Sequence, residues 1–83
     1  MTRKVYTVRD AKAEVFNNPF YQTTHGEAER TFKALAQNKE SMVGKYPEDY
    51  DLYYIGEFDD VKGNIMTLDT PQHIVKAVQL ITQ

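Results

Sequence analysis

The 83-residue sequence contains no cysteine and only two histidines, four glycines and three prolines. Without cysteine, disulfide bonds, thiol catalysis and cysteine-based zinc sites are excluded. The glycines do not have the spacing of a phosphate-binding or dinucleotide-binding loop, and no serine-nucleophile motif is present. His25 and His73 each fall in the first turn of an expected helix, where a surface role is commoner than catalysis. We therefore expect no catalytic residue, no cofactor and no enzyme activity.

Long apolar runs are also missing. No stretch approaches the roughly 18 apolar residues that cross a bilayer, and the start MTRKVYTVRD lacks the apolar segment of a signal peptide. Apolar content of 41% and charged content of 27% are ordinary for a folded chain. We expect a soluble, intracellular protein with no membrane contact. Residues 1–83 are expected to form a single domain, whose small size leaves a thin margin of stability.

Charge is divided unevenly along the chain, although the net charge is only −2. Residues 1–45 carry eight basic and five acidic side chains, whereas residues 46–83 carry two basic and seven acidic ones. The first part is therefore suited to approach phosphate. The second part opposes strong non-specific binding to nucleic acid.

A β-hairpin is expected at the beginning of the chain. The segment Lys4–Arg9 alternates and is rich in β-branched and aromatic residues, which predicts a strand. Asp10, Ala11 and Lys12 are expected to form a turn, because an aspartate carboxylate can accept nearby backbone N–H groups. The segment 13–16 (AEVF) is then predicted to be the returning strand. Pro19 ends this pattern.

The best-marked helix begins at Thr24. Thr24 and Glu27 have the spacing of a capping box. An apolar stripe on one helix face follows, formed by Ala28, Phe32, Leu35 and Ala36. The helix is expected to end near Asn38, and residues 39–46 are expected to form a loop.

Residues 49–58 and 65–68 are predicted to form a second hairpin. Thr70 and Pro71 then have the order of a helix start, and Ile74, Val78 and Ile81 fall on one helical face. The alternative is a terminal strand, since Ile74 and Val75 are β-branched. The resulting fold class is α+β, a small antiparallel sheet of about four strands with two helices packed on one face, in the order β-β-α-β-β-α.

The segment 46–60, YPEDYDLYYIGEFDD, contains six acidic and five aromatic residues. Its carboxylates do not have the ligand spacing of a calcium loop, because Tyr53 occupies the third ligand position and no glycine follows. No metal site is therefore expected. Alternation instead predicts an interior strand, with one apolar face formed by Tyr50, Leu52, Tyr54, Gly56 and Phe58. Gly56 allows another backbone to approach closely.

Basic and aromatic residues are interleaved near the first hairpin, which is a pattern typical of single-strand binding. The candidate nucleic-acid-binding residues, with two cations from the outer face of the helix, are Arg3, Lys4, Tyr6, Arg9, Lys12, Phe20, Tyr21, Arg30 and Lys33. The alternative is that the aromatic rings belong to the core and the cations are solvated strand ends. Few phosphate contacts are available, so modest and salt-sensitive binding is expected.

Several stretches in this order resemble the small non-structural protein of gokushoviruses, which are single-stranded DNA phages of the Microviridae. The resemblance covers roughly residues 3–66. It rests on KVYTVRDAKA, Pro19-Phe20, the Glu/Ala-rich helix with Phe32, and above all YPEDYDLYYIGEFD followed by Gly63. It implies a DNA-binding phage protein of the host bacterial cytoplasm, made during infection. It further implies a counterpart of the microvirus protein that switches replication to single-stranded DNA synthesis and packaging. It carries over no functional residues.

Two functions are therefore kept. The first is binding of single-stranded DNA, or regulation of viral DNA synthesis and packaging. The second is a non-enzymatic adaptor that contacts the phage replication initiator, host replication machinery or procapsid, which the net negative charge favours. Self-association into a homodimer is a further expectation, since a sheet of about four strands has exposed edges.

Overall fold

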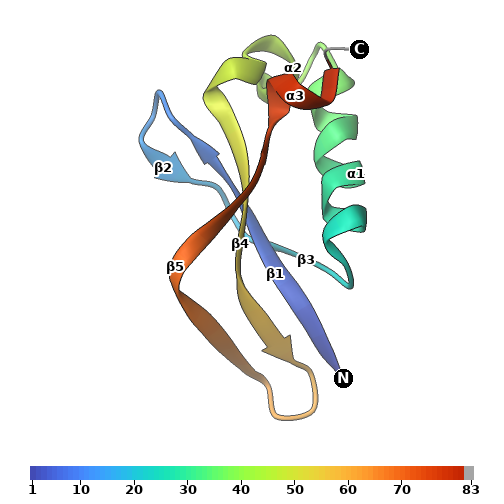
Figure 1. The fold of residues 1–83 in the computed structure, drawn as a ribbon, viewed down its shortest axis with the longest axis vertical. Coiled ribbons are helices and arrows are strands. Elements are labelled where there is room, and N and C mark those ends of the chain that lie inside the picture. The colour runs from blue at the N-terminus through green and yellow to red at the C-terminus, as the bar shows by residue number, and fades with distance from the viewer. Residues whose placement is uncertain (82–83) are drawn as a thin grey trace.

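The computed structural model describes residues 1–81 and has the expected α+β class: a curled antiparallel sheet with helices against one face (Figure 1). No helix within these residues is both long enough and apolar enough to cross a membrane. In chain order the elements are β1 (Thr2–Asp10), β2 (Val15–Phe16), β3 (Phe20–Gln22), α1 (His25–Gln37), α2 (Met42–Lys45), the 3-10 helix η1 (Pro47–Asp49), β4 (Tyr50–Asp59), β5 (Asn64–Lys76) and α3 (Ala77–Ile81).

The sheet has the order β2-β1-β4-β5, and β3 also pairs with β1. The first hairpin is confirmed, with Arg9 opposite Phe16, but its returning strand is shorter than predicted. Ala13 and Glu14 belong to the turn, where Glu14 has a φ of 60°, and only Val15 and Phe16 form β2. The turn itself forms as expected, because the Asp10 carboxylate accepts the backbone N–H groups of Lys12 and Ala13 at 3.0 and 3.2 Å. The short strand β3 was not predicted. It places Tyr21 opposite Val5, so that β2 and β3 cover the same edge of β1.

Helix α1 begins and ends where its sequence predicts. The Thr24 hydroxyl accepts the backbone N–H of Glu27 at 3.1 Å, and Asn38 is the C-terminal cap. The Glu27 carboxylate accepts the backbone N–H of Thr23 at 3.2 Å, one residue earlier than a capping box requires. Leu35 is a correction to the predicted stripe, because its side chain is 40% exposed. Within the expected loop, four residues form α2.

The expected helix from Thr70 is wrong over residues 70–76, which continue β5, and only the last part is helical. The physical reason is the long ladder that β4 presents, since each unpaired N–H and C=O of an interior strand needs a partner. The β-branched Val75 pairs opposite Leu52. Pro71 falls in the irregularity between the Tyr54–Gln72 and Gly56–Thr67 pairs, where its missing N–H costs no regular ladder bond.

Strand β4 is interior to the sheet, as predicted, and its alternation builds the core. Tyr50, Leu52 and Tyr54 are buried under the helices, together with Phe32 of α1 and Tyr6 of β1. Phe58 does not continue this face. The register shift after Tyr54 turns it toward Tyr21, with ring centres 5.6 Å apart. Within residues 1–81 the helices all lie on one side of the sheet, which leaves the other face without a helix over it (Figure 1).

Candidate nucleic-acid interface

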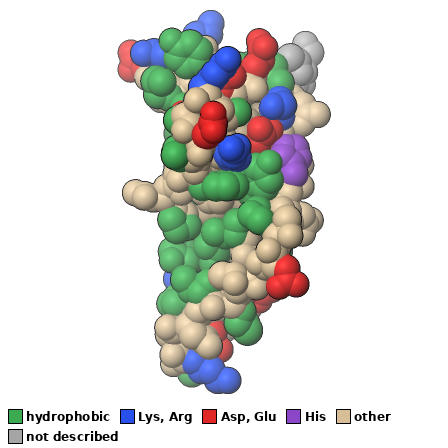
Figure 2. Space-filling view, turned by 90° about the vertical axis from the view of Figure 1, so that its left-hand side faces the viewer, with side chains coloured by type: hydrophobic (Ala, Val, Ile, Leu, Met, Phe, Trp, Pro, Cys, Tyr) green, Lys and Arg blue, Asp and Glu red, His purple; other side chains and the backbone are tan. Residues whose placement is uncertain are grey.

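The sheet face without helices, here called the open face, is determined by alternation along β1. Tyr6 and Val8 pack into the core under α1, so Arg3, Val5, Thr7 and Arg9 point to the opposite side. Figure 2 shows this side of the molecule, with hydrophobic side chains over much of its length and charged ones gathered toward its two ends. The open face consists of Arg3, Val5, Thr7, Arg9, Phe16, Tyr21, Tyr53, Ile55 and Phe58. Val5 and Thr7 are buried beneath their neighbours on this face.

Two aromatic pairs stand on the open face. Phe16 of β2 contacts Tyr53 of β4 edge to face, with ring centres 5.4 Å apart. Tyr21 of β3 contacts Phe58 of β4 near the other end of the face. Phe16 and Tyr21 are 46% and 44% exposed. One ring of each pair therefore keeps a large surface in contact with solvent, held in place by its partner ring.

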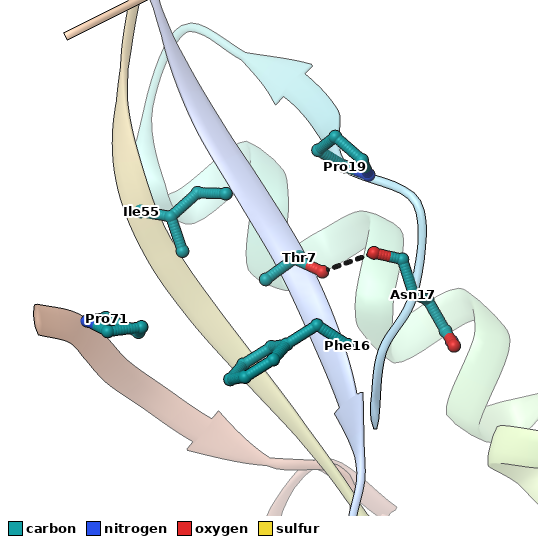
Figure 3. Close-up of a pocket in the computed structure, with 6 residues that line it drawn as sticks. All are labelled: Thr7, Phe16, Asn17, Pro19, Ile55 and Pro71. Carbon is teal, nitrogen blue, oxygen red and sulfur yellow. Dashed lines mark hydrogen bonds between the residues drawn. The ribbon is translucent and has the colours of Figure 1, made fainter. Parts of the chain in front are cut away.

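A shallow pocket lies beside the Phe16 ring. It is lined by Thr7, Phe16, Asn17, Pro19, Ile55 and Pro71, and its volume is about 270 Å³ (Figure 3). The buried Thr7 hydroxyl donates to the Asn17 carbonyl at 2.7 Å, so its hydrogen is already used. The remaining lining is almost entirely apolar. The pocket is thus suited to a flat or branched apolar group.

The cations of the open face lie beside carboxylates. The Arg3 guanidinium is 3.8 Å from the Asp60 carboxylate at one end. The Arg9 guanidinium carbon is 5.5 Å from the centre of the Phe16 ring, in cation–π geometry, and Arg9 pairs opposite Asp51. The same aspartate also contacts His73 and Lys76, at 3.0 and 3.4 Å. The face is therefore weakly basic, with no concentrated positive field.

Two of the predicted aromatic contacts need correction. Tyr6 is fully buried, and its hydroxyl is 2.5 Å from Nδ1 of His25. Burial, reinforced by the neighbouring Tyr54 and Glu27, raises the pKa of Tyr6 to about 12. Phe20 stacks on the Tyr6 ring at 5.8 Å, on the helix side of the sheet. We therefore remove both rings from the interface, because neither presents a face to the open side.

The remaining predicted cations do not share one surface. Lys4 alternates with Arg3 and points to the helix side, whereas Lys12 is exposed in the turn after β1. Arg30 and Lys33 line a shallow hollow on α1 beside Leu80, away from the open face. Of the nine predicted residues, the structure brings together only Arg3, Arg9 and Tyr21.

Three aromatic residues of the interface, Phe16, Tyr53 and Phe58, were not predicted as binding residues. For Tyr53 a signal exists, since alternation places it opposite the core residues Leu52 and Tyr54. For Phe58 alternation gives the wrong face, because the register shift lies between it and Tyr54. Within residues 1–81, no group of three or more His, Asp or Glu side chains is arranged to hold a metal ion.

Comparison with protein families gives one match. The model of the phage ORF5 protein family matches residues 3–80, which is nearly the whole chain, and the protein belongs to that family. No curated protein and no solved structure matches the chain significantly. The family confirms the coarser part of the expectation from sequence, a bacteriophage protein.

Proposed function

We propose that this member of the phage ORF5 protein family binds single-stranded DNA on its open face, in the cytoplasm of the infected bacterium. The observation that carries the proposal is the row of exposed rings beside Arg3 and Arg9. Tyr21 and Phe16 pair opposite Val5 and Arg9, so their positions are about 13 Å apart along β1, at roughly 3.3 Å per residue. A sheet face that holds separated rings beside arginines is suited to stacking bases without reading their sequence.

The charges of the face limit the expected affinity. Two arginines supply at most about two phosphate contacts, and both lie close to carboxylates. With two contacts, the logarithm of the binding constant should fall with the logarithm of salt concentration with a slope of about −1.4 for single strands. Most of the binding free energy then comes from stacking, at about 1–3 kcal/mol per base. Modest affinity for exposed single strands fits a regulator of viral DNA synthesis and packaging, the role that the gokushovirus resemblance implies.

Fluorescence anisotropy with a labelled oligonucleotide tests this proposal. The variants Phe16→Ala and Tyr21→Ala should each weaken binding of single-stranded DNA by about tenfold, because each removes one stacking ring. The matched control is Tyr46→Ala, which removes an aromatic side chain that is 53% exposed but lies outside the open face. It should bind as the unmodified protein does.

Cation variants locate the phosphate contacts. Replacing both Arg3 and Arg9 with glutamate should abolish binding of single-stranded DNA. Replacing both Arg30 and Lys33 with glutamate should have little effect on that binding. Absence of binding to single strands even at low salt would refute the proposal. If the two double variants lose equal amounts of affinity for single-stranded DNA, the open face is not the binding site.

The apolar pocket favours a second candidate function, a protein–protein adaptor. No charged side chain lines the pocket, and its apolar lining suits a side chain of a partner protein. The partners to consider are the replication initiator, host replication machinery and the procapsid. Affinity purification from infected cells after nuclease treatment should then recover a phage or host protein. The variant Ile55→Glu, which places a carboxylate in the pocket, should lose that protein. Unchanged recovery would count against this function.

A further inference from the structure

Strand β5 leaves one edge of the sheet unpaired. It is the last strand in the order β2-β1-β4-β5, and within residues 1–81 its only strand partner is β4. The opposite edge differs, because β2 and β3 cover β1 there. Figure 1 shows the lower part of β5 on the outside of the molecule, beyond the reach of the helices. The backbone N–H and C=O groups of its outer side are therefore available to another strand.

This edge lacks the features that usually prevent pairing. Residues 64–68 (NIMTL) contain no charge and no proline, and all are exposed. Ile65, Met66 and Leu68 are 49%, 53% and 37% exposed, so apolar side chains stand on both faces of the strand. The ladder with β4 is regular from Asn64 to Thr67, its irregularity begins at Leu68, and Pro71 comes after the segment. An exposed apolar edge of this kind is a template for strand addition.

We propose that the partner is a second copy of the chain, and that residues 64–70 of two copies pair antiparallel about a two-fold axis. When this axis is perpendicular to the sheet, the same face of both copies lies on the same side of the joined sheet. Odd-numbered residues therefore lie opposite odd-numbered residues, and even-numbered opposite even-numbered. With Thr67 opposite Thr67 of the second copy, Met66 lies opposite Leu68 and Ile65 opposite Asp69. The Thr67–Thr67 and Met66–Leu68 pairs are favourable across strands, whereas Ile65 opposite Asp69 adds little.

Charge also fits a second copy. The only charged residue in the paired segment is Asp69. In this register the two Asp69 carboxylates are separated by four residues along the strands, or about 13 Å, which exceeds the screening length of about 8 Å at physiological salt. Pro71 lies just outside the segment, so its missing N–H does not interrupt the pairing. The two open faces then lie on the same side of one continuous sheet.

A charge-exchange experiment tests the pairing. The variants Thr67→Lys and Thr67→Glu each place like charges opposite each other at the two-fold axis, and each should be monomeric in sedimentation velocity. An equimolar mixture should restore a species of twice the monomer mass, because lysine then faces glutamate. The control is Val61→Lys, at the exposed hairpin tip outside the paired segment, which should remain dimeric.

Hydrogen exchange supplies a measurement that needs no variant. The outward amides of residues 64–68 should become protected as the concentration of the unmodified protein rises, while those of the exposed turn at residues 11–13 should not. A monomer at all concentrations would overturn the proposal. So would dimers that persist in both Thr67 variants, or variants whose mixture stays monomeric, because the interface would then lie elsewhere or in another register.

Discussion

The substitution Gly56→Ala tests how β4 and β5 are held together. Gly56 lies opposite Thr67, and the two backbones approach unusually closely. A methyl group at position 56 would lie 2.3 Å from the carbonyl oxygen of Met66 and 3.0 Å from Cα of Thr67. Both are backbone atoms, so no side chain can rotate to make room. The strands must therefore separate locally or β5 must shift.

The magnitude follows from two opposing terms. Overpacking of a well-packed site costs about 1–3 kcal/mol, and alanine recovers about 0.5–1 kcal/mol because it restricts the unfolded chain more than glycine does. We expect a net loss of about 1–2 kcal/mol in the free energy of unfolding. For a domain of this size, that lowers the melting temperature by roughly 5–10 °C.

Urea unfolding followed by circular dichroism measures this loss, and Gly26→Ala is the matched control. The same methyl group at position 26 meets no atom closer than 3.9 Å, and the site lies in the first turn of α1. Alanine favours the helix there by up to about 1 kcal/mol. The two substitutions should therefore change stability in opposite directions. If Gly56→Ala proves as stable as the unmodified protein, the close approach of the two strands is refuted.

Two further predictions concern stability. Burial raises the pKa of Tyr6 to about 12 from an ordinary value of 10.0, and it also raises the pKa of Tyr50 and Tyr54. The folded state thus favours the protonated tyrosines, so the free energy of unfolding should be at its full value below pH 10 and decline as the pH rises toward 12. Unfolding midpoints should show a smaller decline for the variant Tyr6→Phe, which lacks the Tyr6 hydroxyl. Thr24→Ala removes the hydroxyl that accepts the Glu27 N–H and should cost about 1 kcal/mol in urea unfolding, whereas Thr31→Ala, an exposed threonine within α1, should cost less.

Local signals predicted much of the fold. The boundaries of α1 follow from Thr24 and Asn38. The Thr24 side chain and the Asn38 backbone N–H each form a hydrogen bond with a residue three positions away, and these bonds cap the two ends of the helix. The Asp10 turn is equally local. For β4, alternation predicted correctly that Tyr50 and Leu52 are core residues. These features depend on interactions within a turn or a strand, which the sequence records directly.

The candidate interface was predicted only in part. Basic and aromatic residues near the first hairpin were identified together, but alternation divides them between two faces of the sheet. Tyr6 and Tyr21 look alike in sequence, yet one is buried against His25 and the other is exposed beside Phe58. Helix α1 packs on the face that contains Tyr6, and this decides which of the two tyrosines is buried. The alternation of a strand cannot predict which face a helix will cover when both faces contain aromatic rings.

The sequence by itself determined strand β1 and the turn after it, helix α1, the interior strand β4 and the absence of cysteine chemistry. The tertiary structure decided the length of β5, the reversal of Phe58 and the composition of the open face. The reason is the range of the interactions. Capping and alternation act between near neighbours, whereas Val75 became a strand residue because Leu52, 23 positions earlier, offered a ladder partner. Only the assembled sheet shows which edge and which face remain available for binding.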